Sequence, residues 1–241
     1  GSLECTLLIP ARIVELYFPT IFLEGEISAQ AVLTFRGGQW SISAKGSGQA
    51  LSFSPPHFPL FSFRDAAVDW EIEGDILRLK RFSAVLSGGL VEGDGEVRLR
   101  QKEARVNLRT TAFWLDFSPA LEAKIAGNAT LTLTPEGGFL WGSASVVKGT
   151  ISLESLPVVA LEEFPYPLSL SFRLDIPAGV VAEGEAFRFH PSGFLYFTGS
   201  YHSPRLYGTM QMQAGDEIAL LGKTFRVEEG LLEWFGPLLH P

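Results

Sequence analysis

The chain contains one cysteine, Cys5, among its 241 residues. A single thiol excludes an intrachain disulfide. It leaves the compartment open, because a protein of the reducing cytosol and a disulfide-poor envelope protein use cysteine in the same way.

Long apolar runs are missing as well. No run approaches the ~18 residues that a helix needs to span a bilayer, and no secretory signal is visible. Gly1-Ser2 has the composition of a remnant left by tag cleavage, so it is left out of the fold argument. We therefore expect residues 3–241 to be a piece of a longer protein.

Basic residues are outnumbered, with 19 Lys and Arg against 27 Asp and Glu, for a net charge of −8. This balance argues against a nucleic-acid partner. The densest basic run comprises Arg98, Arg100, Lys102, Arg105 and Arg109, which mostly alternate with apolar residues. The alternation predicts the solvated face of a strand pair, and a membrane-surface role is the alternative.

Recognisable catalytic and metal-binding patterns are absent. The four histidines lie at positions without metal-ligand spacing, and the sequence has no nucleophile elbow and no phosphate-binding loop. The glutamate pairs 162–163 and 228–229 are adjacent, so on a strand their carboxylates would point to opposite faces. We expect no enzymatic activity, no metal and no cofactor. The histidines are His57, His190, His202 and His240.

What the chain does have is apolar alternation separated by glycine turns. From Leu168 to Ile176 every second residue is apolar, and Met210 and Met212 alternate with glutamines. Period-2 alternation places apolar side chains on one face of a sheet. Short strands between regular turn signals predict an all-β chain. The predicted strands are Thr6–Ile9, Glu26–Phe35, Trp40–Lys45, Gln49–Ser54, Ala67–Glu73, Ile76–Arg81, Ser83–Ser87, Gly95–Arg100, Ala104–Thr110, Asn128–Thr134, Phe139–Val147, Thr150–Leu153, Pro167–Ile176, Glu185–His190, Gly193–Gly199, Arg205–Ala214, Ile218–Leu221, Thr224–Glu228 and Leu231–Phe235.

Two segments permit a helix. Residues 118–127 begin with Ser-Pro and end with Gly, yet they fit a strand-turn-strand equally well. Residues 156–164 would form a turn or two of helix, or a kink near 154–167 between two stretches of sheet. Neither segment is long enough to cover the apolar face. A sandwich, a barrel or a sheet curled into a trough would each solve that problem, and the pattern leaves all three open.

The last forty residues repeat a pattern of short strands and glycine turns. This pattern resembles that of the TamB family of AsmA-like bridge lipid-transfer proteins. The resemblance extends over residues 80–241, whereas residues 3–60 match poorly. It implies an elongated curled sheet, the U-shaped β-taco, with an apolar interior groove. The residues that carry it are Gly215, Ile218, Leu221, Gly222, Phe225, Val227, Gly230, Leu232, Trp234, Gly236 and Pro237.

The resemblance also implies a function and partners. Family members carry lipid acyl chains across the periplasm, have an inner-membrane anchor and work with a BamA-like outer-membrane partner. We therefore expect a phospholipid conduit in the cell envelope, with the anchor outside residues 3–241. The alternative is a scaffold that assists outer-membrane protein assembly by β-augmentation. The expected groove residues are Leu168, Leu170, Phe172, Leu174, Ile176, Phe187, Phe189, Met210, Met212, Ile218, Leu220, Phe225, Val227, Leu232 and Trp234.

Overall fold

The computed structural model describes residues 2–10, 22–54, 62–117, 121–152, 167–184, 187–220 and 223–237. Within these ranges every regular element is a strand, and the strands belong to one hydrogen-bonded sheet. The all-β prediction is thereby confirmed. The chain divides into two compact units, residues 1–109 with 130–136 and residues 110–129 with 137–241, called unit 1 and unit 2 below.

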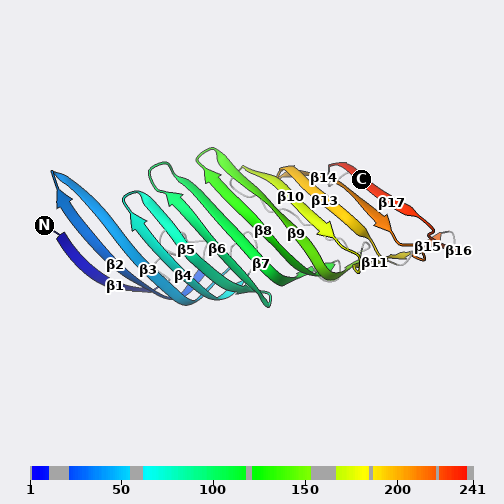
Figure 1. Ribbon diagram of the computed structural model, residues 1–241, viewed down its shortest axis with the longest axis horizontal. Helices are drawn as coiled ribbons and strands as arrows, with labels where there is room; N and C mark the ends of the chain where they lie inside the picture. Colours follow the sequence, from blue (N-terminus) through cyan, green and yellow to red (C-terminus); the bar gives the residue numbers. More distant parts are fainter. Residues whose placement is uncertain are drawn as a thin grey trace. The chain divides into compact units, whose positions relative to one another are not determined.

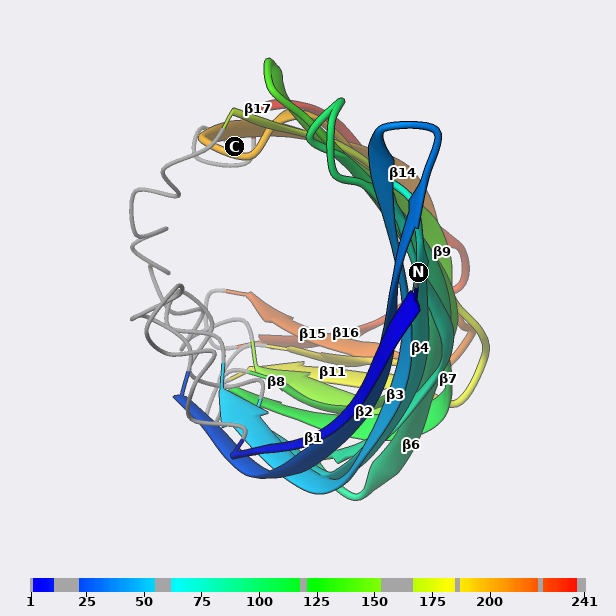
Figure 2. The same cartoon turned by 90° about the vertical axis from the view of Figure 1, so that its left-hand side faces the viewer.

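Unit 1 is an antiparallel meander in which each strand pairs with the next along the chain (Figure 1). Its strands bend along their length, which Figure 2 shows for β2 and β3. The strands are β1 (Ser2–Pro10), β2 (Phe22–Arg36), β3 (Gln39–Ser54), β4 (Phe63–Glu73), β5 (Ile76–Leu86) and β6 (Gly89–Arg98), with parts of β7 (Glu103–Phe117) and β8 (Leu121–Thr134).

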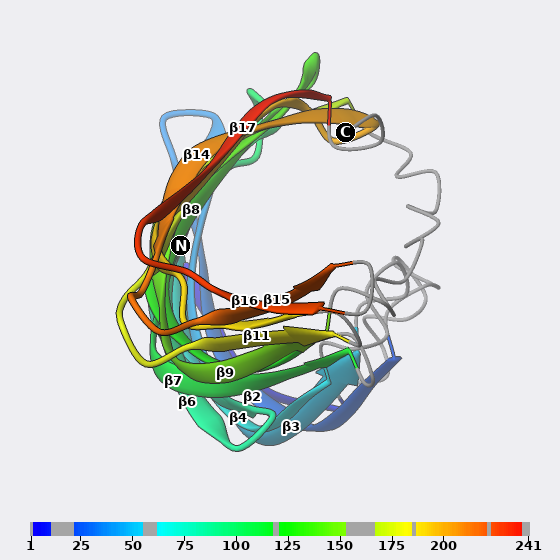
Figure 3. The same ribbon diagram turned by 90° about the vertical axis from the view of Figure 1, so that its right-hand side faces the viewer.

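Unit 2 contains a branch point. The first part of β9 pairs in parallel with β10, and its last residues pair in parallel with β11. One branch continues through β13, β14 and β17, and the other through β12, β15 and β16. Figure 3 shows β14 and β17 diverging from β15 and β16. The bounds are β9 (Gly137–Ser152), β10 (Leu168–Ile176), β11 (Val181–Gly184), β12 (Phe187–Phe189), β13 (Ser192–Ser200), β14 (Ser203–Met212), β15 (Glu217–Leu220), β16 (Lys223–Arg226) and β17 (Gly230–Pro237).

Several strands are longer than the alternation predicted. The pairs Trp40–Lys45 with Gln49–Ser54, Ile76–Arg81 with Ser83–Ser87, and Phe139–Val147 with Thr150–Leu153 are single strands β3, β5 and β9. In β3 and β5 a β-bulge inserts one residue, so consecutive apolar positions are three apart instead of two. Gly48 and Leu51 in β3, and Leu79 and Phe82 in β5, therefore remain on one face. In β5 the period-2 criterion took this step of three for a strand end, whereas in β3 the predicted gap at residues 46–48 lies just before the bulge.

The strand reading of residues 118–127 holds from Leu121 onward, because Ala123 and Ile125 are buried at period 2 in β8. The short strand β11 was not predicted. The possible helix at 156–164, the kink near 154–167 and the pair Glu162–Glu163 lie outside the described residues, as does His57.

In both units half-buried aromatic and other large apolar side chains pack over the buried residues. In unit 1, Leu51, Ala66 and Ala84 are buried, and Phe63 and Phe82 pack over them while staying half-buried. In unit 2, the buried residues are packed by half-buried Phe172, Leu174, Leu195, Leu232 and Trp234, among others. The largest side chains thus keep apolar area open to solvent. The buried residues of unit 2 are Ala123, Ile125, Ala144, Val146, Ile176, Val180 and Met210.

A buried carboxylate fixes the turns at the branch of unit 2. Asp216, between β14 and β15, accepts hydrogen bonds from the backbone N–H groups of His190 (3.0 Å) and Gln213 (2.8 Å). Its other oxygen lies 2.8 Å from His190 Nδ1. Burial raises the pKa of Asp216, but the hydrogen bonds from His190 and Gln213 outweigh it and leave the pKa below its ordinary value.

We expect Asp216→Ala to lower the free energy of unfolding by ~2 kcal/mol, because two part-buried N–H donors lose a charged acceptor. Because the folded-state pKa lies below the unfolded one, the carboxylate contributes stability above the unfolded pKa. That contribution is lost as the pH falls through the folded value. Urea unfolding at pH 7 and at pH 3 measures both effects. The exposed neighbour Glu217→Ala is the control, with an expected change within ~0.5 kcal/mol; an equal loss in both variants would contradict the role of Asp216.

The bulge of β3 generates a second prediction. Ala50 has φ +52°, in the left-handed region that costs an L-residue roughly 1 kcal/mol or more. We expect Ala50→Gly to raise the unfolding free energy by about 0.5–1 kcal/mol, whereas Ala44→Gly, in the regular part of the same strand, should lower it by about 1 kcal/mol. Denaturant titration of the two variants checks the opposite signs. Destabilisation by both glycines would show that the bulge is not strained.

Candidate functional site: an apolar sheet face

Strand register separates apolar from polar residues in unit 1. Residues paired directly across strands share a face of the sheet. One such row runs Ala31, Ala44, Ile72, Leu77 and Val97, entirely apolar. The adjacent row on the other face runs Gln30, Lys45, Glu71, Arg78 and Glu96. These two sides are called the apolar face and the polar face.

The apolar face of unit 1 has glycines beneath its largest side chain. Trp70 lies in the row Ala29, Gly46, Trp70, Leu79 and Gly95. A Cβ at position 46 would come within 2.3 Å of the Trp70 ring, so the indole lies directly over the glycine. Glycine at position 46 therefore lets a bulky ring lie flat on the sheet and keeps the face shallow.

The same segregation holds on the first branch of unit 2. Phe172 is paired with Gly142 and Phe197, and Phe197 with Leu206. Leu174 pairs with Ala144 and Leu195, and Met210 pairs with Gly193 and Leu232. None of these side chains carries a charge. The first branch therefore has an apolar face of its own.

All nine expected groove residues of the first branch fall on this apolar face. Their burial differs, however. Leu168, Ile176 and Met210 are buried, so they pack within the sheet and offer little surface to a ligand. The others are half-buried. The nine are Leu168, Leu170, Phe172, Leu174, Ile176, Met210, Met212, Leu232 and Trp234.

The remaining six lie on or beside the second branch. Phe187, Ile218 and Phe225 occupy directly paired positions in β12, β15 and β16. Phe189 is buried and pairs with buried Ala182. Phe225 is 52% exposed, which makes it the most accessible of the predicted residues whose side chains the structure describes. The six are Phe187, Phe189, Ile218, Leu220, Phe225 and Val227, of which the side chains of Phe187 and Leu220 lie outside the description.

Sequence reasoning placed no groove residue before Leu168, yet the apolar face extends through unit 1. Leu3 and Ile42 on this face are 64% and 46% exposed, and Phe35 is exposed as well. The signal was present in the alternation of Glu26–Phe35. This alternation did not lead to a groove prediction, because the segment lacks the glycine-bounded turns of the C-terminal strands.

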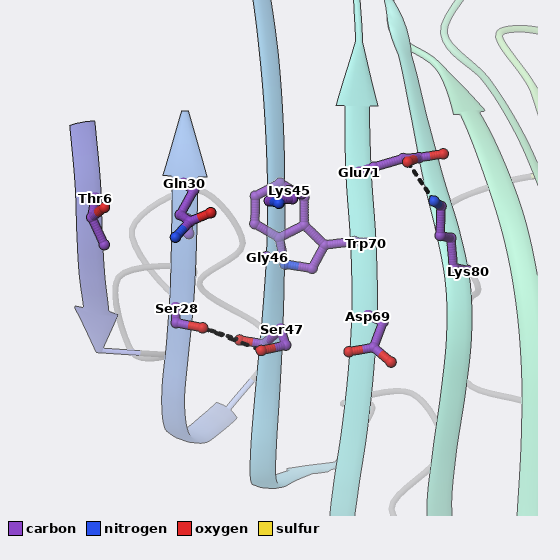
Figure 4. A pocket seen from close by; sticks show the side chains of 11 residues that line it. Thr6, Ser28, Gln30, Lys45, Gly46, Ser47, Asp69, Trp70, Glu71 and Lys80 are labelled. Atoms are coloured by element: carbon purple, nitrogen blue, oxygen red, sulfur yellow. Dashed lines mark hydrogen bonds and ion pairs between the residues drawn. The ribbon is translucent and has the colours of Figure 1, made fainter. Parts of the chain in front are cut away.

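The polar face of unit 1 is an ion-pair surface with a shallow depression of about 400 Å³ (Figure 4). Lys80 Nζ lies 2.6 Å from Glu71 Oε2, and Ser28 and Ser47 share a hydrogen bond of 3.2 Å. The hydrogen bond from Lys80 holds the pKa of Glu71 below its ordinary value against a small opposing effect of burial. The five residues of the basic run are exposed. This is a solvated surface of balanced charge and has no catalytic arrangement.

Within the described ranges, no group of three His, Cys, Asp or Glu side chains could hold a metal ion. The described part of the chain also has no helix long and apolar enough to cross a membrane.

Comparison with known proteins bears on the family. The model of the TamB C-terminal domain matches residues 80–241, which is more than half of the chain. No curated protein and no solved structure matches the chain. The match covers the branch point, both branches and the last strands of unit 1. The chain therefore belongs to the TamB family.

Proposed function

We propose that the apolar face binds the acyl chains of phospholipids and forms part of a conduit between the inner and outer membranes of a diderm envelope. Membership of the TamB family supports a role in envelope lipid transport or in the translocation and assembly module. The single observation that carries the lipid proposal is the apolar face itself, whose large side chains remain half exposed.

Energetics favour an apolar occupant. Exposed apolar surface costs roughly 25 cal/mol per Å², and each Phe or Trp contributes 150–250 Å² when fully buried. Within the described ranges, strands form one sheet and no second layer packs on this face. Acyl chains would cover the open area without requiring directional polar contacts. The proposed groove needs no polar selector, so head groups would remain in water.

Strand length fits the same occupant. Each of β3 and β9 has 16 residues and spans about 50 Å at ~3.3 Å per residue. The hydrocarbon core of a whole bilayer is about 30 Å thick, so a single acyl chain is shorter than these strands. A chain lying along a strand would leave room for its head group beyond the apolar rows.

The wider setting is part of the same proposal. The family points to the periplasm or cell envelope. We propose that the complete protein is anchored in the inner membrane outside residues 3–241, that it meets a BamA-like outer-membrane protein, and that it performs no catalysis. A scaffold acting by β-augmentation is the competing function, and it requires no bound lipid.

We expect phospholipid to co-purify with the detergent-free protein at near-stoichiometric amounts, because water is a poor solvent for the open apolar face. Lipid extraction and mass spectrometry measure the amount, with a globular β-sandwich protein of similar size purified in parallel as the control. A folded, lipid-free protein that also takes up no added phospholipid would favour the scaffold.

A pair of matched variants tests the face. We expect Phe225→Asp to weaken phospholipid binding about tenfold, because the charge adjoins the acyl chain, while the fold survives. Phe235 is 75% exposed on the polar face, so Phe235→Asp should leave lipid binding unchanged. Phe172→Arg should also weaken binding and should lower the melting temperature, since half-buried Phe172 packs against the core of unit 2. Binding of a fluorescent phospholipid and thermal melting check all three, and equal lipid binding by the Phe225 and Phe235 variants would contradict the proposal.

A further inference from the structure

Exposed aromatic side chains cross the polar face of the first branch of unit 2. In one row, Tyr196, Tyr207 and Phe235 are directly paired across β13, β14 and β17, which run side by side in Figure 1. Phe235 is 75% exposed and Tyr196 36%. On the polar face of β1–β6, by contrast, no described side chain is aromatic. Exposed aromatic surface of this kind marks a binding site more often than a solvated face.

Two aromatic residues of β9 lie on the same face, in the two neighbouring rows. Trp141 pairs with Ser171 of β10, and Phe139 with Ser169. Both rings are exposed, at 41% and 43%. The aromatic positions therefore reach across the whole branch, with β10 contributing small hydroxyl side chains between them.

Polar groups around these rings are held in place. Ser171 Oγ and the Tyr196 hydroxyl share a hydrogen bond of 2.5 Å. Arg173 lies in the aromatic row, 2.7 Å from Asp175 Oδ1, and its guanidinium lies 4.5 Å from the centre of the Phe194 ring. Fixed donors beside aromatic rings are the elements with which proteins bind small polar ligands.

Charge narrows the choice of occupant. Within the rows, Arg173 and Arg205 are balanced by Asp175 and Glu233, although the chain as a whole has a net charge of −8. A neutral surface has no attraction for an anionic bilayer or a nucleic acid. Its remaining polar groups are mainly hydroxyls, including Thr198. The complementary ligand is uncharged and rich in hydroxyl groups.

We propose that this surface binds an uncharged linear glycan. We name it the aromatic–hydroxyl face and define it by Phe139, Trp141, Ser171, Arg173, Tyr196, Tyr207 and Phe235. Sugar rings present apolar C–H faces, which pack on aromatic rings, and equatorial hydroxyls, which pair with serine, tyrosine and arginine. Neighbouring strands are ~4.8 Å apart, so directly paired rings recur at a spacing close to that of successive sugars in a β-linked chain.

The site is independent of lipid binding, since it lies on the opposite face of the sheet. In the envelope setting proposed above, the sugar backbone of peptidoglycan, which is uncharged between its peptide stems, would offer this chemistry. A protein that crosses the periplasm would thereby be held against the wall while its apolar face stays free.

The test is isothermal titration calorimetry, in which the whole chain is titrated with the β-1,4-linked hexamer of N-acetylglucosamine and the heat of binding is measured. We expect a dissociation constant below about 1 mM. Trp141→Ala and Phe235→Ala should each weaken binding at least fivefold. Phe225→Ala is the control, because it removes an exposed phenyl ring from the opposite, apolar face. It should leave glycan binding unchanged and should reduce phospholipid binding. Tyr196→Phe keeps the ring and should keep most of the affinity, and circular dichroism melting verifies that each variant is folded.

Several results would overturn the proposal. The first is no saturable binding of the hexamer below 1 mM by the folded protein. The second is equal loss of glycan binding in the Phe225 and Phe235 variants. If Trp141→Ala and Phe235→Ala instead abolish self-association in sedimentation, or binding to phosphatidylcholine vesicles, the surface belongs to a second copy or to a bilayer. Lipid binding by the parent is measured separately, so failure of the glycan site and failure of the lipid proposal are distinguishable.

Discussion

The period-2 alternation of side chains, kept in register from strand to strand, is the constraint on which the rest of this protein depends. A strand places successive side chains on opposite faces, and backbone pairing transfers that choice to its neighbour. Rows that begin with Ala31 or Gln30 therefore remain apolar or polar across five strands. Because both faces of a single sheet remain accessible, such a sheet can present two chemically different surfaces from one layer of backbone.

Packing on the apolar face reverses the usual arrangement of a core. Small side chains such as Ala66 and Ala84 are fully buried, while Phe63 and Phe82 lie over them and remain half-buried. In a two-layer protein the second layer would cover those rings. Here the same hydrophobic contacts that hold the strands together leave an apolar surface. The residues that stabilise the sheet are therefore also those that would bind an acyl chain: one surface of each ring packs on the buried residues, and the other surface stays open.

The sequence predicts features that depend on the local pattern of residues, but it does not predict pairing between strands that are distant in sequence. The alternation of Leu168–Ile176 and the glycine-bounded strands around Phe225 predicted both strands and faces, because each depends only on neighbours in sequence. The branch at β9 could not be predicted, since one strand there pairs in parallel with two others that are distant in sequence. The bulge of β5 was misread as a strand end, because one extra residue looks locally like a loss of periodicity. The Asp216 site escaped notice because two of its partners are backbone N–H groups, which leave no trace in the sequence, and the third, the side chain of His190, is 26 residues away.

The bulges also determine where this gene can gain or lose a codon. Removing one residue from the regular part of β3, between Gln39 and Gly48, would turn every residue on one side of the deletion to the opposite face and bring lysine and serine side chains onto the apolar side. Removing Ala50 would only straighten the strand, because Gly48 and Leu51 would then be two residues apart and would stay on the same face. Single-codon insertions and deletions should therefore accumulate in the turns between strands during evolution, whereas additions in multiples of two residues can lengthen a strand without exchanging its faces.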